Sequence, residues 1–279
     1  MRSQTSAPKP RAAPTFASIV CGINGSRPSF EAARQAALLA DPGAGVTYVA
    51  VSWEQGTGAN AQATLSHAHA RDCLRRARDE ARELGVDPGI IAENAENPTR
   101  RLMELAAGQD LLVVGIAGHS RAGGIIIGST ATALVHRSPL PVLVARRPPE
   151  GVEFPSRILL ASDGTPRSDA ATTLTARIAA RHGAHVAIVG ARDHDLPFQP
   201  GLDEHATQII AATGVEPLVL QAPGPPDRAV ADAARNFDAS LVVTGCRSLT
   251  GLPALRSASE RIAHAAPCSV LVARSAPEA

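Results

Sequence analysis

The sequence predicts an α/β protein with two tandem flavodoxin-like (Rossmann-like) doubly wound domains, each a five-stranded parallel sheet with helices on both faces. Three observations support this fold class. Short apolar segments alternate with amphipathic ones, as parallel strands alternate with the helices that join them. This alternation occurs twice in the same order. The 279 residues, 44% of them hydrophobic, are enough for two domains of common size.

Three landmarks recur in the two halves of the chain, and their shared order indicates a tandem duplication. The first is an apolar segment followed by Asn or Asp, then Gly, then Ser or Thr. The second is an apolar segment that ends in Gly, and the third is the pattern HxxPxxVLVAR. They read SIVCGINGSRPS (18–29), LLVVG (111–115) and HRSPLPVLVAR (136–146) in the first copy, and RILLASDGTPRS (157–168), LVVTG (241–245) and HAAPCSVLVAR (264–274) in the second.

The elements of the first copy follow from the spacing of its apolar residues. Short continuous apolar runs predict buried strands, and Ala-rich segments with apolar residues three or four positions apart predict helices. The expected order is strand 19–23, helix 29–40, strand 46–51, helix 59–84, strand 89–94, helix 98–107, strand 111–115, helix 130–137 and strand 141–145.

The second copy repeats this alternation after a proline-rich linker. Its expected elements are strand 157–161, a helix from 167, strand 184–190, a short helix near 203–212, strand 216–221, a helix after 226, strand 240–245, helix 259–265 and strand 269–273. We therefore expect a disordered tail over 1–15, a first domain over 16–146, a linker over 147–156 and a second domain over 157–275.

Composition excludes several classes of function. A net charge of +1 argues against nucleic-acid binding, and no segment resembles a signal peptide or a membrane span, so we expect a cytoplasmic protein. The one lysine, Lys9, lies in the tail, which excludes a Walker A phosphate loop. The four cysteines form no CxxC pair and are expected to be buried free thiols.

The segment GIAGHSRAGGIIIGST, residues 115–130, is the strongest candidate for a binding site. Such a glycine cluster either forms a structural loop or lets the backbone approach a ligand closely, most often a phosphate. A helix expected to begin near Ser129 would add N–H donors and a favourable dipole, and Thr130 a further hydroxyl. Because ligands bind where the strand order of an open sheet reverses, we expect Gly115 and Asn24 to face the same crevice.

The spacing Gly115-x2-Gly118-x9-Gly128-Ser129 resembles the ATP-binding signature of the universal stress protein family. The NGS after the first strand and the closing HRSPLPVLVAR are also similar to that family, and the resemblance covers about 16–275. It implies a stress-response regulatory protein in which the glycine loop of the first domain holds ATP, with or without Mg²⁺, aided by backbone contacts near Val51.

Two departures from the family pattern affect the predicted site. The resemblance implies an acidic residue after the first strand, where this chain has Asn24; an amide keeps an oxygen acceptor for a ribose hydroxyl but loses the charge. The second copy keeps the acid as Asp163, but Ser248 and Arg256 replace two loop glycines. We therefore expect a degraded nucleotide loop in the second domain, unable to bind ATP in the family manner.

Other functions remain open at this stage. The protein could be a ligand-free scaffold with vestigial nucleotide sites, or a very slow ATPase, although no catalytic residue is evident. His69 and Cys73 have metal-like spacing without a third ligand, so we expect no metal site. The resemblance implies that the closing strands of the two copies pair within one chain. A homodimer is a further option, and a regulatory protein partner is implied without being identified.

Overall fold

The computed structural model describes residues 14–52, 67–116, 128–192, 201–246 and 257–274. Several predictions fall outside these ranges: almost all of the N-terminal tail, the start of the helix expected from 59, and the centres of both loops. The candidate loop residues Gly118, Ser248 and Arg256 are among them.

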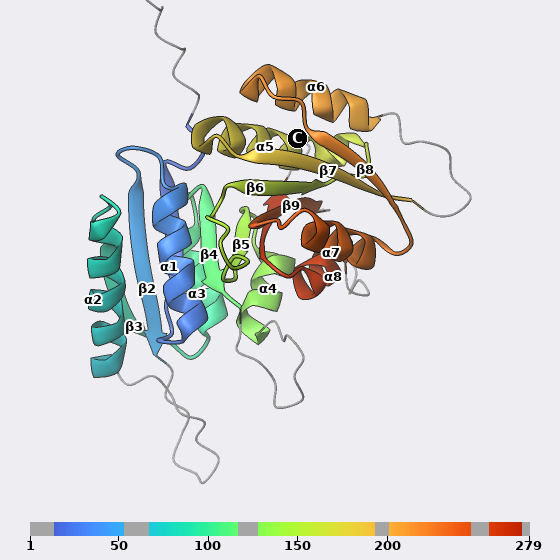
Figure 1. Ribbon diagram of the computed structural model, residues 1–279. Helices are drawn as coiled ribbons and strands as arrows, with labels where there is room; N and C mark the ends of the chain where they lie inside the picture. The colour runs from blue at the N-terminus through green and yellow to red at the C-terminus, as the bar shows by residue number, and fades with distance from the viewer. Residues whose placement is uncertain (1–13, 53–66, 117–127, 193–200, 247–256, 275–279) are drawn as a thin grey trace, which may run out of the picture.

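The first half of the chain alternates strands and helices as predicted, and Figure 1 shows it in blue to green. Its expected helices and strands within the described ranges are all present. The bounds are β1 Ser18–Gly22, α1 Arg27–Leu39, β2 Gly45–Ser52, α2 His67–Glu83, β3 Gly89–Asn94, α3 Pro98–Ala106, β4 Leu111–Gly115, α4 Ser129–Arg137 and β5 Val142–Ala145.

The second half repeats this order, shown in yellow to red in Figure 1. The strand expected from 216 begins only at Leu218, because Pro217 has no N–H to donate to the ladder with β7. The bounds are β6 Arg157–Ala161, a 3₁₀ turn Pro166–Ser168, α5 Asp169–His182, β7 His185–Arg192, α6 Gly201–Thr213, β8 Leu218–Pro223, α7 Pro226–Asn236, β9 Leu241–Cys246, α8 Ala258–Ala265 and β10 Ser269–Arg274.

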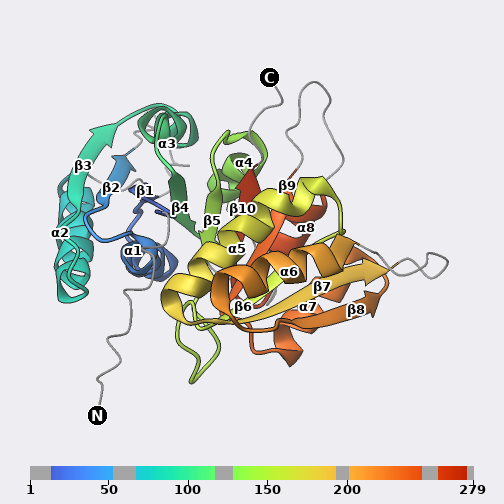
Figure 2. The ribbon, with the colours of Figure 1, turned by 90° about the horizontal axis from the view of Figure 1, so that it is seen from above.

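All ten strands form one sheet in the order β3-β2-β1-β4-β5-β10-β9-β6-β7-β8. Within each half the strands are parallel and the order is 3-2-1-4-5, so the strand order reverses between the first and fourth strands. Helices cover both faces, and Figure 2 shows α1 and α2 on one side of the first-half strands and α3 and α4 on the other. The predicted fold class, two tandem doubly wound domains, is confirmed.

The two halves meet through an antiparallel pairing of β5 with β10. The paired residues are Val144 with Val270, Leu143 with Leu271 and Val142 with Val272, and their side chains are fully buried. Each strand would otherwise be an exposed sheet edge with unpaired N–H and C=O groups. The pairing predicted from the two VLVAR segments is therefore observed within one chain.

The arginine that ends each VLVAR segment reaches the last helix of the other half. Arg146 donates to the carbonyls of Ala263 at 2.7 Å and Cys268 at 3.1 Å, and Arg274 donates to the carbonyl of Val135. These partners include the final carbonyls of α8 and α4, which no intrahelical N–H can satisfy. Burial lowers the pKa of Arg146 to about 10, so its guanidinium stays charged at neutral pH.

Replacing Arg146 with Ala is expected to lower the free energy of unfolding by about 2–4 kcal/mol, because the buried carbonyls of α8 lose their donors. The neighbouring Arg147 is exposed, and Arg147→Ala is expected to change stability by less than about 0.5 kcal/mol. Denaturant unfolding of both variants beside the wild type measures the difference. Equal stability of the two variants would remove the capping role of Arg146.

Candidate functional site

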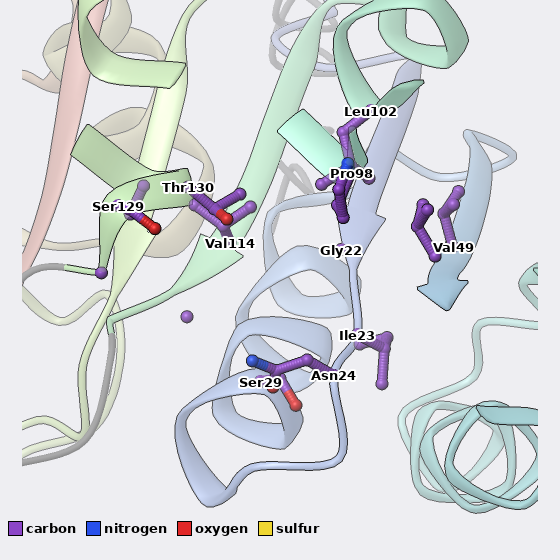
Figure 3. A pocket seen from close by; sticks show the side chains of 14 residues that line it. Gly22, Ile23, Asn24, Ser29, Val49, Pro98, Leu102, Val114, Ser129 and Thr130 are labelled. Carbon is purple, nitrogen blue, oxygen red and sulfur yellow. The ribbon is translucent and has the colours of Figure 1, made fainter. Parts of the chain in front are cut away.

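A cavity of about 280 Å³ lies at the carboxyl ends of β1 and β4, where the strand order of the first half reverses. Figure 3 shows the side chains that surround it. The residues that line it are Gly22, Ile23, Asn24, Ser29, Val49, Val51, Pro98, Leu102, Val114, Gly115, Gly128, Ser129, Thr130 and Ala131.

Six of the seven binding residues predicted from the sequence are on this lining, and the seventh, Gly118, lies outside the described residues. They come from three separate segments: the turn after β1, the end of β2, and the two ends of the loop between β4 and α4. The expected crevice shared by Asn24 and Gly115 is therefore present. The sequence did not single out Val49, Pro98 or Leu102, which also line it and which read as ordinary core or helix-start residues.

The side chain of Asn24 is fixed by the turn that leads into α1. Its Oδ1 accepts hydrogen bonds from the N–H of Ser26 at 3.1 Å and from the Ser26 hydroxyl at 2.7 Å. Ser26 in turn is the N-cap of α1 and accepts from the N–H of Ser29. The oxygen is thus used within the turn, and Figure 3 shows the amide nitrogen directed toward the side where Ser129 lies. Asn24 offers the cavity a donor, and the expectation of a free oxygen acceptor was wrong.

Gly115 is required by packing. A Cβ added to it would lie 2.5 Å from the carbonyl carbon and oxygen of Pro28, at the start of α1. The corresponding Gly245 of the second half is also crowded, with a Cβ 2.8 Å from the carbonyl oxygen of Arg167. A glycine at the end of the fourth strand therefore lets the start of α1 in the first half, and the 3₁₀ turn before α5 in the second, approach the sheet, whatever the cavity holds.

The first backbone N–H groups of α4 belong to residues that line the cavity, and they have no acceptor within the helix. Its N-cap is Gly128, which has no side chain to accept a hydrogen bond from the first turn. The first intrahelical bond is that from the N–H of Thr132 to the carbonyl of Gly128, so the preceding N–H groups have no helical acceptor. With the positive end of the helix dipole, this is a favourable place for an anion.

The equivalent position in the second half holds a larger cavity of about 480 Å³, with different polar groups. Asp163 replaces Asn24, and its Oδ1 accepts from the Thr165 and Ser168 hydroxyls at 2.7 and 2.8 Å. Although burial alone raises it, these hydrogen bonds hold the pKa of Asp163 below its ordinary value. At the start of α8, Ser257 is the N-cap and accepts from the N–H of Glu260, so one first-turn donor is already used.

The other sequence expectations concern thiols, metals and membranes. All four cysteines are free and buried, as predicted. Within the described ranges, no group of three or more His, Cys, Asp or Glu residues is arranged to hold a metal ion. None of the helices described is both long and apolar enough to cross a bilayer.

Gly115→Ala is expected to destabilise the protein by about 1–3 kcal/mol in the absence of any ligand, because the added methyl group overlaps the backbone of Pro28. Gly45→Ala is the matched control, since a Cβ at the start of β2 meets no atom within 4 Å. Denaturant unfolding without nucleotide measures both. If Gly115→Ala were as stable as Gly45→Ala, the packing role of this glycine would be refuted.

Comparison with known proteins agrees with the fold and the repeat. Residues 15–146 and 155–274 each match the universal stress protein family. The universal stress protein Rv2005c of Mycobacterium tuberculosis is 28% identical over 224 residues, which are 74% of this chain and 75% of that protein.

Two solved structures share the two-domain arrangement. A universal stress protein from Archaeoglobus fulgidus superposes with a TM-score of 0.75 at 18% identity, covering 93% of this chain and 97% of that one. A Pseudomonas aeruginosa protein described as a universal stress protein gives a TM-score of 0.64 at 19% identity, covering 93% of each chain. With both halves matched in sequence, the chain belongs to the universal stress protein family.

Proposed function

We propose that the first domain binds an adenine nucleotide, ATP with or without Mg²⁺, and that its occupancy regulates a stress response in the cytoplasm through a protein partner. The observation that carries the proposal is the convergence of Asn24, Val51, Gly128, Ser129 and Thr130 on one cavity at the switch point of the sheet. The loop signature and the family resemblance predict each of them as a nucleotide contact.

The cavity has a polar end and an apolar end that suit the two parts of a nucleotide. The uncapped start of α4 offers backbone N–H groups and a favourable dipole to phosphate oxygens. Val49, Val51 and Leu102 give an apolar wall, as is usual where a flat ring is held. The Asn24 amide nitrogen lies toward the polar side and can donate to a ribose hydroxyl. Gly118 belongs to the same proposed contact set through the loop signature.

Binding is favoured over hydrolysis. None of the described residues that line the cavity is a carboxylate or a lysine. Efficient phosphoryl transfer needs a group that orients the attacking water and cations that neutralise the developing charge. We therefore infer a nucleotide-binding protein whose ATPase activity, if measurable, is slow. In the second domain, Ser257 and Asp163 make the equivalent site less suitable for phosphate.

The test uses a matched pair of variants at corresponding positions of the two halves. Counted from the shared HxxPxxVLVAR segment, Thr130 corresponds to Ala258, and each lines the cavity of its own half. In the wild type, ATP at about 100 times its Kd is expected to stabilise by about 2.7 kcal/mol, a rise in Tm of roughly 5–10 °C. Thr130→Trp should abolish the rise by filling the first cavity, and Ala258→Trp should keep it.

Calorimetric scans of the three proteins with and without ATP, in MgCl₂ and in EDTA, give the result and its metal dependence. No rise in the wild type at millimolar ATP would replace this proposal with a ligand-free scaffold. A rise lost in Ala258→Trp and kept in Thr130→Trp would place the nucleotide in the second domain.

Asn24→Asp is expected to tighten ATP binding by about tenfold at neutral pH. One carboxylate oxygen would keep the hydrogen bonds to Ser26, and the other would replace the amide nitrogen and accept from ribose hydroxyls with a charge-assisted bond. Titration calorimetry measures the change in Kd. Weaker binding to Asn24→Asp would mean that the donor, and not an acceptor, is what this position supplies.

A further inference from the structure

A chain of three hydrogen-bonding side chains lies beside the cavity of the second domain. The Ser162 Oγ is 2.8 Å from Nδ1 of His205, and Nε2 of His205 is 3.1 Å from Oδ1 of Asp169. His205 is 3% exposed and Ser162 is 6% exposed, yet Ser162 is on the lining of the 480 Å³ cavity. Ser162 therefore connects the lining of the cavity, to which it belongs, with a buried imidazole.

The second half has its own means of bringing these residues together. The turn after β6 carries Ser162, α5 begins at Asp169, and α6 carries His205; Figure 1 shows α6 lying along α5. Gly201, the first residue of α6, packs so closely that a Cβ on it would lie 1.8 Å from the carbonyl oxygen of Gly164. This contact places His205, one turn further along α6, against the start of the turn.

The first half lacks the arrangement. When SIVCGINGSRPS is aligned with RILLASDGTPRS, Ser162 corresponds to Ile23, and the next position places Phe30 opposite Asp169. Since the same fold position is built without a serine or a carboxylate in the first half, the doubly wound fold itself does not require this chain of hydrogen bonds.

The contacts fix the roles of the two ring nitrogens. A carboxylate accepts hydrogen bonds only, so the nitrogen facing Asp169 carries a proton, and in the neutral ring the other nitrogen is an acceptor. That acceptor, Nδ1, faces the Ser162 hydroxyl. In familiar serine hydrolases the ring is turned the other way, but the requirement is the same: one basic nitrogen on the serine and one N–H held by a carboxylate.

We propose that Ser162 is a nucleophile for acyl transfer from small uncharged carboxylic esters, with His205 as its general base and Asp169 as a positioning residue. Ser162 Oγ bonds to the ester carbonyl carbon while its proton passes to Nδ1 of His205. The bond from that carbon to the alcohol oxygen breaks, and the proton from Nδ1 goes to the leaving alcohol. Water, losing a proton to His205, then hydrolyses the acyl-serine and restores the Ser162 hydroxyl.

Two features of the cavity support the charge changes of this reaction. The N–H of Gly164 donates to the Ser162 Oγ at 3.0 Å and stabilises negative charge on that oxygen as its proton leaves. The start of α8 contributes Ala258 and Ser259 to the same cavity, so the positive end of its dipole favours negative charge there, with one first-turn N–H already bonded to Ser257. An uncharged ester also avoids repulsion by the Asp163 carboxylate, which lines the cavity.

The first experiment treats the full chain with a fluorophosphonate probe, which transfers its phosphonyl group to an activated serine and releases fluoride. Intact mass and peptide mapping are expected to show one adduct, on Ser162. His205→Gln should slow labelling by about 100-fold or more, since general base catalysis is lost. Absence of an adduct on Ser162, or an adduct formed equally fast in His205→Gln, would overturn the proposal.

Three controls separate catalysis from structure. Ser257 and Ser259 line the same cavity with their hydroxyls 3.1 Å from each other, so they should remain unmodified and serve as internal controls. The Asp169 side chain is 54% exposed, so Asp169→Asn should fold even if His205→Gln does not. With p-nitrophenyl acetate as substrate, Asp169→Asn should lower the acylation rate constant and leave KM unchanged. A change in KM alone would show that Asp169 only supports the structure and does not position His205.

Discussion

The antiparallel pairing of β5 with β10 is the constraint on which the rest of the structure depends. It turns two five-stranded sheets into one of ten strands and covers both strands that would otherwise be exposed edges. It also reverses the strand direction between the halves. The carboxyl ends of the first-half strands therefore point one way and those of the second-half strands the other, so the two cavities open at opposite ends of the strands. Corresponding helices of the two halves lie on the same face of the sheet: α1, α2, α5 and α6 on one face, and α3, α4, α7 and α8 on the other. Each of the two hydrophobic cores therefore extends across both halves.

The pairing also brings α4 and α8 into contact, and the two helices contribute different residues to that contact. Glu260 of α8 is buried, and its Oε2 lies 2.7 Å from Nε2 of His136 on α4. At the position of α4 that corresponds to Glu260 the chain has Thr132, and His264 of α8 lies 3.8 Å from Oε1 of the same Glu260. A buried carboxylate needs polar neighbours, and the imidazoles of His136 and His264 lie beside it, although Oε2 makes no hydrogen bond within the described residues. Each of these helices begins at one cavity and continues to this shared junction.

Much of the architecture could be predicted because short segments of the sequence determine where strands and helices begin and end. The apolar runs and the repeated landmarks predicted the alternation of strands and helices in both halves, the glycine before Ser129 predicted the start of α4, and the family resemblance implied the pairing of the VLVAR segments. The orientation of Asn24 could not be predicted, because an amide can turn either end outward and the choice depends on Ser26. The contact between His205 and Ser162 could not be predicted either, because the two residues are 43 positions apart and the first copy has no corresponding pair to suggest it.

The apolar side of the first cavity was missed for a different reason. Val49 and Leu102 have the composition and spacing of core residues, and only the reversal of strand order leaves a gap between the elements that carry them. Gly115 was predicted as a ligand contact and does line the cavity, but helix packing by itself already requires a glycine there. Patterns of residue type therefore locate the cavity better than they assign a role to each residue on it.

The two cavities share a fold position but differ in the charge that they offer a ligand. The described lining of the first has no charged side chain and includes a helix start without a side-chain cap, which together favour an anion. The lining of the second contains both the Asp163 carboxylate and Arg167, and its helix start is capped by Ser257. A phosphate there would be placed near a carboxylate, whereas an uncharged ligand would not be repelled. The two halves thus share one fold and are joined by the β5–β10 pairing, while the cavities at the two ends of the strands offer different polar groups to a ligand.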